Sequence, residues 1–197
     1  MKTLHITSGN SLTALLKEQD YPGAFLTWQE MLCEGPTAEI IDSDEFFAVR
    51  RQFLQDFYDI EVNEEEFRKE IGILDHMEAF DQIVLWFQYD LFCYINLMAV
   101  ISMLSQKNVG LPIYLVSSGR VEGEKELKGL AELKPDQLKN QFNLKIKLSK
   151  EDVELMKSLW KTYCGTDHNL FKPHIVQKTS FLYLGSCLKA HLQRFPD

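Results

Sequence analysis

Four clusters of polar residues follow short apolar runs along this chain, and each contains groups that could bind an anion or move a proton. They span residues 8–11, 28–34, 88–90 and 117–120. In the first cluster, Gly9 permits a tight turn, and a helix beginning after it would offer backbone N–H groups and a positive dipole end to an anion. These residue types indicate recognition of a phosphate or carboxylate, with acids nearby that could act as general bases.

The first cluster supports two interpretations. Ser8, Gly9, Asn10 and Ser11 could bind an anion together, or Asn10 or Ser11 could simply cap the following helix. A short motif containing one glycine favours the cap when it is taken alone. The three companion clusters make the two interpretations about equally strong.

The acids of the second and third clusters are the candidate catalytic groups. Glu30 and Asp90 could serve as general bases, and Glu30 or Glu34 could bind hydroxyl groups, as the acid after a second strand does in dinucleotide-binding sheets. Each has a simpler alternative. Glu30 and Glu34 could belong to an ordinary exposed loop, and Asp90 is well placed to cap a helix that begins near Leu91.

Basic and aromatic residues could complete a binding site. Arg120 is the best candidate to pair with a phosphate or carboxylate, because its planar guanidinium can form two parallel hydrogen bonds, and Arg50 and Arg51 are alternatives. Exposed arginines are more often solvated surface groups. Trp28 and Trp86 could stack on a base or ring, although aromatic residues beside strands more often belong to the core. The candidate ligand-binding set is Ser8, Gly9, Asn10, Ser11, Trp28, Glu34, Trp86, Gln88 and Arg120.

Hydrophobic patterning predicts the scaffold that would position these groups. Strands are expected at residues 3–7, 24–28, 83–87 and 112–116, with helices beginning near Leu12, Ser43, Asn63 and Leu91. The 83–87 run is apolar throughout, which is typical of a strand covered on both faces of a parallel sheet. The alternation predicts an α/β protein with a Rossmann-like, open and mostly parallel sheet of about four strands. In such a sheet, all four clusters lie at one edge, where ligands bind.

The chain divides into three parts in this interpretation. Residues 1–120 form an α/β ligand-binding core, and residues 121–148 form a connecting segment with a short helix from Pro135. Residues 149–197 form a helical region packed on the core, with one helix capped by Ser149 and a last helix from Thr179 to His191.

Composition narrows the class of function. A formal charge of −8 disfavours nucleic acid and anionic lipid as partners, and no apolar run approaches the roughly 20 residues needed to span a bilayer. The chain starts with a strand rather than an apolar leader, so we expect a cytoplasmic protein. The four cysteines and five histidines lack metal-binding spacing, so we predict no structural metal. The sequence identifies no cofactor and no oligomeric state.

A series of short motifs runs in a fixed order along nearly the whole chain: Leu4-His5-Ile6, Gly9-Asn10-Ser11, Trp28 with Glu30, Cys33-Glu34-Gly35-Pro36, Leu85-Trp86-Phe87, Asp90-Leu91-Phe92, Asn96-Leu97, and Leu188 through His191 to Arg194-Phe195-Pro196. In this order they resemble the bacterial family catalogued as domain of unknown function 1835. The resemblance implies a bacterial cytoplasmic protein of uncharacterised activity. Family members typically have Gly-Asp where this chain has Gly9-Asn10, and an acid where it has Gln88. The two missing carboxylates argue against inherited acid–base or metal chemistry.

A serine hydrolase is one alternative. Gly9-Asn10-Ser11-Leu12 is similar to the nucleophile block of the Gly-Asp-Ser-Leu hydrolases, in which Ser11 would attack an ester. That mechanism needs an Asp-x-x-His motif near the C-terminus, and neither His168 nor His191 has an acid three positions earlier. Two hypotheses remain stronger. One is a protein that binds a phosphorylated or nucleotide-like small molecule and could act as a hydrolase or transferase. The other is a non-catalytic sensor or protein-interaction module.

Overall fold

The computed structural model describes residues 1–194, which contain a five-stranded sheet. Its strands are β1 (Thr3–Ser8), β2 (Ala24–Trp28), β3 (Gln82–Trp86), β4 (Ile113–Val116) and β5 (Ile146–Lys147), in the spatial order β2-β1-β3-β4-β5. The first four strands are parallel, and β5 pairs antiparallel with β4. The predicted α/β class and Rossmann-like sheet are confirmed. The fifth strand was not predicted, because two residues in a charged segment carry no periodic signal.

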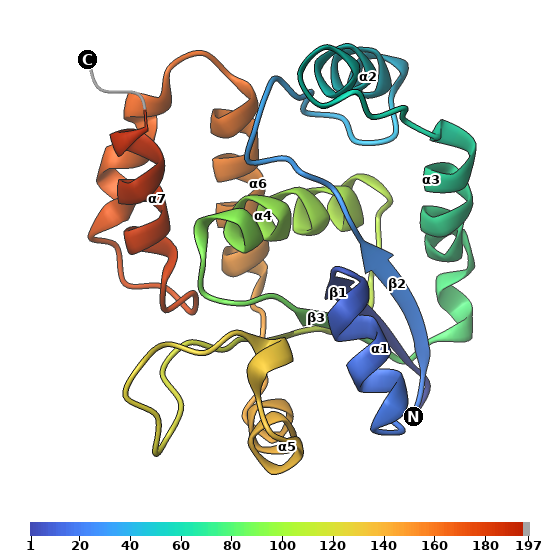
Figure 1. The fold of residues 1–197 in the computed structure, drawn as a ribbon, viewed down its shortest axis with the longest axis vertical. Helices are drawn as coiled ribbons and strands as arrows, with labels where there is room; N and C mark the ends of the chain where they lie inside the picture. The colour runs from blue at the N-terminus through green and yellow to red at the C-terminus, as the bar shows by residue number, and fades with distance from the viewer. Residues whose placement is uncertain (195–197) are drawn as a thin grey trace.

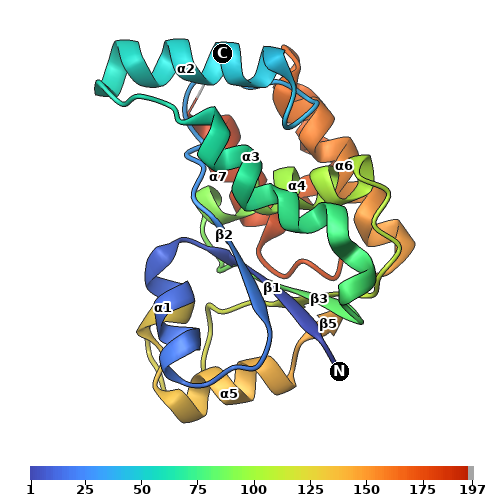
Figure 2. The same cartoon turned by 90° about the vertical axis from the view of Figure 1, so that its right-hand side faces the viewer.

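Helices cover both faces of the sheet. They are α1 (Asn10–Glu18), α2 (Asp44–Tyr58), α3 (Glu64–Ile71), α4 (Leu91–Gln106), α5 (Pro135–Asn143), α6 (Lys150–Cys164) and α7 (Leu184–Gln193), with 3-10 helices η1 (Gly72–Ala79), η2 (Leu130–Glu132) and η3 (His168–Ile175). In Figure 2, α1 and α5 lie on one side of the sheet, and α3, α4 and α6 lie on the other. Two hydrophobic clusters correspond to these two sides.

The helix α4 lies at the centre of the molecule (Figure 1). Every residue from Cys93 to Leu104 is buried. The sheet covers one side of α4, and α6 and α7 cover the rest, with Met156 and Trp160 of α6 in the same cluster as the α4 side chains. This double cover explains why α4 is apolar on all sides rather than on one stripe. The C-terminal helices therefore pack on α4, as the third layer of the fold.

Side-chain caps fix most of the predicted helix starts. The Ser43 hydroxyl accepts a hydrogen bond from the Phe46 N–H at 3.1 Å, and the Asn63 side chain accepts one from the Glu66 N–H at 3.0 Å. Before α6, Ser149 and Asp152 bond each other's backbone N–H groups at 2.9 and 3.1 Å, which completes the predicted capping box. These starts could be predicted because a cap depends on residues only three positions apart.

The last helix begins later than predicted. It was expected from Thr179, but α7 starts at Leu184. The Thr179 hydroxyl accepts a hydrogen bond from the Phe181 N–H at 3.1 Å, and the Ser180 hydroxyl donates to the Asp152 carboxylate at 3.0 Å. These two bonds hold the segment in a turn, because short hydroxyl side chains compete with the helix for backbone partners. Within residues 1–194, no helix is both long and apolar enough to cross a membrane.

Candidate functional site

The parallel register brings the carboxyl ends of β1 to β4 to one edge of the sheet. Ser8 pairs with Trp28, Thr7 with Trp86, and Trp86 with Val116. The four polar clusters therefore follow their strands at the same edge. The helix after β1 covers one face of the sheet, and the helix after β3 covers the other. The connections that leave these two neighbouring strands therefore run in opposite directions and leave a crevice position between them. This is the topological switch point at which open α/β sheets bind ligands.

The helix α1 starts at this switch point without a side-chain cap. Its N-cap is Gly9, with a φ of 105°, and no side chain within residues 1–194 accepts a hydrogen bond from its first turn. The capping role considered for Asn10 or Ser11 is wrong, because both residues lie inside the helix. Asn10 instead donates to the Gln29 side chain at 2.6 Å, and Ser11 is exposed. A Cβ placed on Gly9 would meet no atom within 4 Å, so the space beside Gly9 is open.

Asp90 caps α4, as predicted, and is held by Gln88. One carboxylate oxygen accepts a hydrogen bond from the Cys93 N–H at 2.9 Å, and the other accepts one from the Gln88 amide at 2.8 Å. The Gln88 side-chain oxygen in turn accepts a hydrogen bond from the Leu130 N–H at 3.1 Å. An ionised carboxylate at position 88 could not donate to Asp90. Gln88 thus has a structural role, whether or not it also touches a ligand.

The thiol of Cys93 lies beside this cap. Burial, and next the charge of Asp90, raise the pKa of Cys93 to about 12. The thiolate, rather than the thiol, is the nucleophile in cysteine chemistry. Cys93 therefore stays protonated at neutral pH and acts as a small apolar residue.

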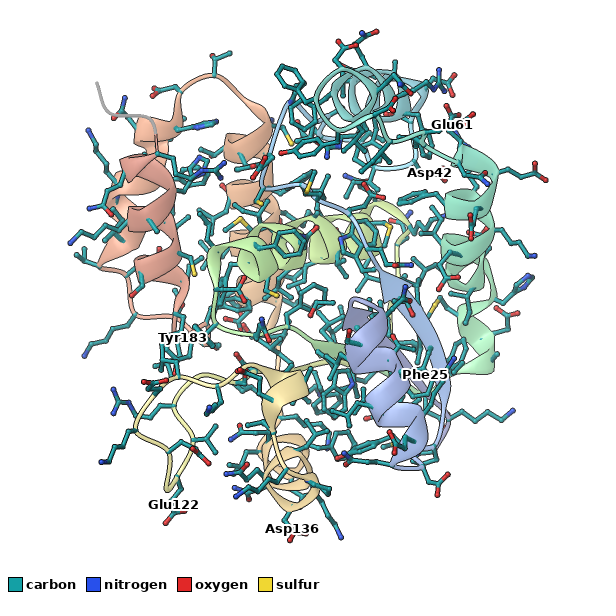
Figure 3. All side chains as sticks on the ribbon, in the orientation of Figure 1. Phe25, Asp42, Glu61, Glu122, Asp136 and Tyr183 are labelled. Carbon is teal, nitrogen blue, oxygen red and sulfur yellow. The ribbon has the colours of Figure 1, made fainter. Side chains whose placement is uncertain are left out.

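A groove of about 470 Å³ lies at the end of β2, between this strand and α3. We call it the β2 groove; its lining includes Trp28, Glu30, Val62, Phe67 and Glu70. Glu30 is half-buried, and this burial raises the pKa of its carboxyl, an effect that the charge of Arg50 opposes. Figure 3 shows Glu61, another lining residue, at the connection between α2 and α3.

The loop that carries Glu30 is fixed by three long side chains from other elements. Arg50 donates to three of its carbonyls at 2.7 to 3.0 Å, Tyr163 donates to one at 2.6 Å, and Arg194 donates to one at 2.6 Å. The acceptors are the carbonyls of Met31, Leu32, Cys33, Glu34 and Pro36. Sequence reasoning missed this support, because the partners lie up to 161 positions away.

The two alternative arginines are engaged elsewhere. Arg50 is 1% exposed and its terminal nitrogens are bonded to the loop carbonyls, so the anion-binding role considered for it is wrong. Arg51 forms an ion pair with Glu64 at the start of α3. Glu34 accepts a hydrogen bond from the Tyr58 hydroxyl, at the end of α2.

Both candidate tryptophans are core residues. Trp86 is 0% exposed, donates to the His5 ring at 3.0 Å and stacks on Phe142 with ring centroids 5.5 Å apart. The stacking role considered for Trp86 is therefore wrong, since the ring has no free face. Trp28 is 3% exposed and donates to the Asn96 side chain at 2.8 Å, so it lies beneath the β2 groove rather than projecting into it.

Arg120 lies at a separate cavity of about 160 Å³ at the end of β4, which we call the β4 cavity. Ser117 and Ser118 also line it, together with residues of α4 and of the segment before α7. The Arg120 side chain is exposed. The four clusters thus share one edge, but the second and fourth border different cavities.

Other chemistry finds less support at this edge. Ser11 has no histidine hydrogen-bonded to it in the part of the chain that the structure describes, so the serine-hydrolase alternative lacks its base. Residues 1–194 also contain no group of three His, Cys, Asp or Glu side chains placed to hold a metal ion.

Fold and site together define an open α/β protein with a switch point between β1 and β3. Comparison with known proteins adds no family to this class: no family model matches the chain, and no curated protein is similar to it in sequence.

Proposed function

We propose that the protein binds a phosphorylated or nucleotide-like small molecule at the carboxyl edge of the sheet. Its anionic group would lie before α1, and its hydroxyl-bearing part would lie in the β2 groove. One observation carries the proposal: α1 begins at the switch point directly after Gly9, with no side-chain cap and with open space beside Gly9. Free backbone N–H groups and the helix dipole favour an anion at such a place.

The β2 groove suits the remainder of the ligand. Its volume of about 470 Å³ falls in the usual range for small-molecule sites. Glu30 could accept hydrogen bonds from ligand hydroxyl groups, and the bond between Asn10 and Gln29 joins the groove to the α1 turn. The fixed loop supports recognition, because groups held in place lose little entropy on binding.

The same geometry is compatible with a hydrolase or transferase. Glu30 is an acid whose pKa is raised by burial, which is the property of a general acid. The alternative is a non-catalytic sensor or protein-interaction module. It is favoured by Gln88, which stands where members of the family that this chain resembles typically have an acid, and which is bonded to Asp90 and Leu130. Membership of the family of domain of unknown function 1835, and a bacterial cytoplasmic location, belong to this proposal and are supported by the order of the motifs.

Thermal unfolding with adenosine monophosphate, ribose 5-phosphate and adenosine tests the binding. A ligand of the native state raises its stability, by about 2.7 kcal/mol at a concentration 100 times the Kd. We expect the two phosphates to raise the unfolding midpoint by several degrees, and adenosine to raise it less. If neither phosphate shifts the midpoint at millimolar concentration, the proposal fails.

A glycine pair locates the site. Gly9→Ala places a Cβ beside the start of α1 and should greatly reduce the shift by the phosphates. Gly123→Ala is the matched control, because Gly123 also has a positive φ and open space around it. Both variants should lose a similar amount of stability without ligand, since both strain the backbone. Equal ligand responses in the two variants would contradict binding at α1.

Glu30→Gln distinguishes an enzyme from a sensor. If the wild type converts a phosphate compound that it binds, and Glu30→Gln binds that compound without converting it, the protein is an enzyme rather than a sensor.

A further inference from the structure

The β4 cavity is distinct from the site proposed above. It lies between the end of β4, Tyr94 of α4 and the segment that leads into α7. Figure 3 shows Tyr183 where this segment meets the loop after β4. A Cβ at Gly119 would overlap the Tyr183 hydroxyl, so this glycine allows the two segments to close on each other. No residue of the polar clusters at 8–11 and 28–34, which come directly after β1 and β2, lines the cavity.

Residues that line this cavity carry side-chain hydrogen-bond donors, among them Tyr94, Ser118, Arg120 and Tyr183. The Tyr94 hydroxyl accepts from the Tyr183 N–H at 3.2 Å, and the Tyr183 hydroxyl accepts from the Arg120 N–H at 2.8 Å. Within residues 1–194, neither phenol proton has an acceptor, and the Arg120 guanidinium forms no hydrogen bond or ion pair. The Ser118 side chain is 5% exposed and its hydroxyl has no partner there. A buried hydroxyl without a partner costs free energy unless a ligand supplies one.

The charge of the cavity is unusual for this chain. The protein carries 29 acidic and 21 basic residues, yet none of the described residues that line the β4 cavity is acidic. The nearby Asp152 already accepts hydrogen bonds from the Ser149 N–H and the Ser180 hydroxyl. Burial raises the pKa of Tyr94, which therefore remains a donor at neutral pH. A cluster of donors beside one arginine matches an oxyanion.

The rim of the cavity is apolar. Leu144, Ile146 and Leu182 line it and are 64%, 41% and 78% exposed. Exposed apolar side chains that gather at one opening mark a binding surface more often than scattered ones do. The volume of about 160 Å³ is close to that of a cavity that holds one benzene ring. A small charged group therefore fits inside, and the rest of the ligand would lie on the rim.

We propose that the β4 cavity is a second ligand site, which binds a phosphate monoester with a small apolar substituent. The phosphoryl oxygens accept hydrogen bonds from Arg120, Ser118, Tyr94 and Tyr183, and the substituent packs on Leu144, Ile146 and Leu182. Four donor groups match the three terminal oxygens of a phosphate monoester better than the two oxygens of a carboxylate.

Titration calorimetry with phenyl phosphate, inorganic phosphate, benzoate and benzyl alcohol tests the ligand class. We expect phenyl phosphate to bind at least tenfold more tightly than inorganic phosphate and than benzoate, and benzyl alcohol not to bind measurably. The assignment is overturned if phenyl phosphate shows no saturable binding, if it binds no better than inorganic phosphate, or if benzoate or the alcohol binds as tightly.

Arg120→Gln and its control locate the binding. Arg120 is exposed, so the variant should fold, and it should weaken phenyl phosphate binding at least tenfold. Lys161→Gln removes the same charge from an exposed position on α6 and should leave binding unchanged. Gly9→Ala should also leave it unchanged, which separates this site from the one at α1. Equal affinity in Arg120→Gln and the wild type would overturn the proposal.

Two further variants test the floor and the rim separately. Ser118→Ala should leave the unliganded protein as stable as the wild type or more so, because it removes a buried hydroxyl without a partner. The same variant should lower the affinity for phenyl phosphate several-fold. Leu182→Ser should lower the affinity for phenyl phosphate but not the affinity for inorganic phosphate. The proposed geometry would be contradicted if Ser118→Ala made the unliganded protein markedly less stable. It would also be contradicted if Leu182→Ser lowered the affinities for phenyl phosphate and for inorganic phosphate equally.

Discussion

The two ends of the sheet edge differ in charge, although they belong to one sheet. Four glutamates line the β2 groove, namely Glu30, Glu61, Glu66 and Glu70, whereas no acid lines the β4 cavity among the residues described. Three of these acids come from α3 and the segment before it, and the tyrosines of the β4 cavity come from α4 and the segment before α7. The elements that cover each strand end, more than the strands themselves, therefore set the chemistry there.

The two ends also differ in how they are held. The loop after β2 has five carbonyls bonded by long side chains, while the turn after β4 is joined to the rest of the protein by the Tyr183 hydroxyl and by a bridge from Gly119 to Lys128. We expect variants that remove supports of the β2 loop to cost much more stability than changes at the β4 turn.

Arg50→Ala should have the largest effect. It leaves the carbonyls of Met31, Glu34 and Pro36 without a charged donor and opens a cavity, so the free energy of unfolding should fall by about 3–5 kcal/mol. Urea unfolding measures it. Arg51→Ala is the control, because Arg51 is a surface partner of Glu64 and should cost less than about 1 kcal/mol. Similar losses in both variants would show that the β2 loop is not held by Arg50.

A fall in pH should have the next largest effect, through His191 of α7, the helix that is followed by Arg194, which donates to the β2 loop. Burial, followed by the nearby His168 and Arg194, lowers the pKa of His191 from 6.5 to about 4. The unfolded chain binds this proton more readily than the folded one, so stability falls as the pH drops from 6.5 to 4. We expect this residue to account for a loss of about 2 kcal/mol over that range.

The difference in unfolding free energy between wild type and His191→Gln measures this effect. It should favour the wild type more at pH 7 than at pH 4.5, since the glutamine does not titrate. His76→Gln is the control, because the His76 side chain is 76% exposed. A difference that stays constant with pH would rule out His191 as the titrating group.

Asp90→Ala should have the smallest of the three effects on stability. Asp90 follows β3, which lies between β2 and β4 in the sheet. The alanine substitution removes the cap of α4 and the partner of the Gln88 amide, which we expect to cost about 1 kcal/mol. Asp90→Asn keeps an oxygen for the Cys93 N–H and should cost less. Urea unfolding of the two variants measures these free energies. Equal stability of the alanine variant and the wild type would show that the cap contributes nothing.

Local patterns predicted the parts of this fold that depend on neighbouring residues. The strands β1 to β4 and the caps at Ser43, Asn63, Asp90 and Ser149 are of this kind, and they suffice to place four polar clusters at one edge. The support of the β2 loop by Tyr163 and Arg194 could not be predicted, because it joins residues more than 130 positions apart. The division of the edge into two cavities was missed for the same reason, since it depends on which distant helices cover each strand end.

The burial of α4 on all sides has a consequence for how the chain folds during synthesis. A fragment that ends at residue 120 contains all the parallel strands but lacks α6 and α7, so the apolar side of α4 that faces them would be open to water. Such a surface favours aggregation while the chain emerges from the ribosome. We therefore expect residues 1–120 to aggregate when expressed alone, and the protein to reach its native state only after α6 has been synthesised.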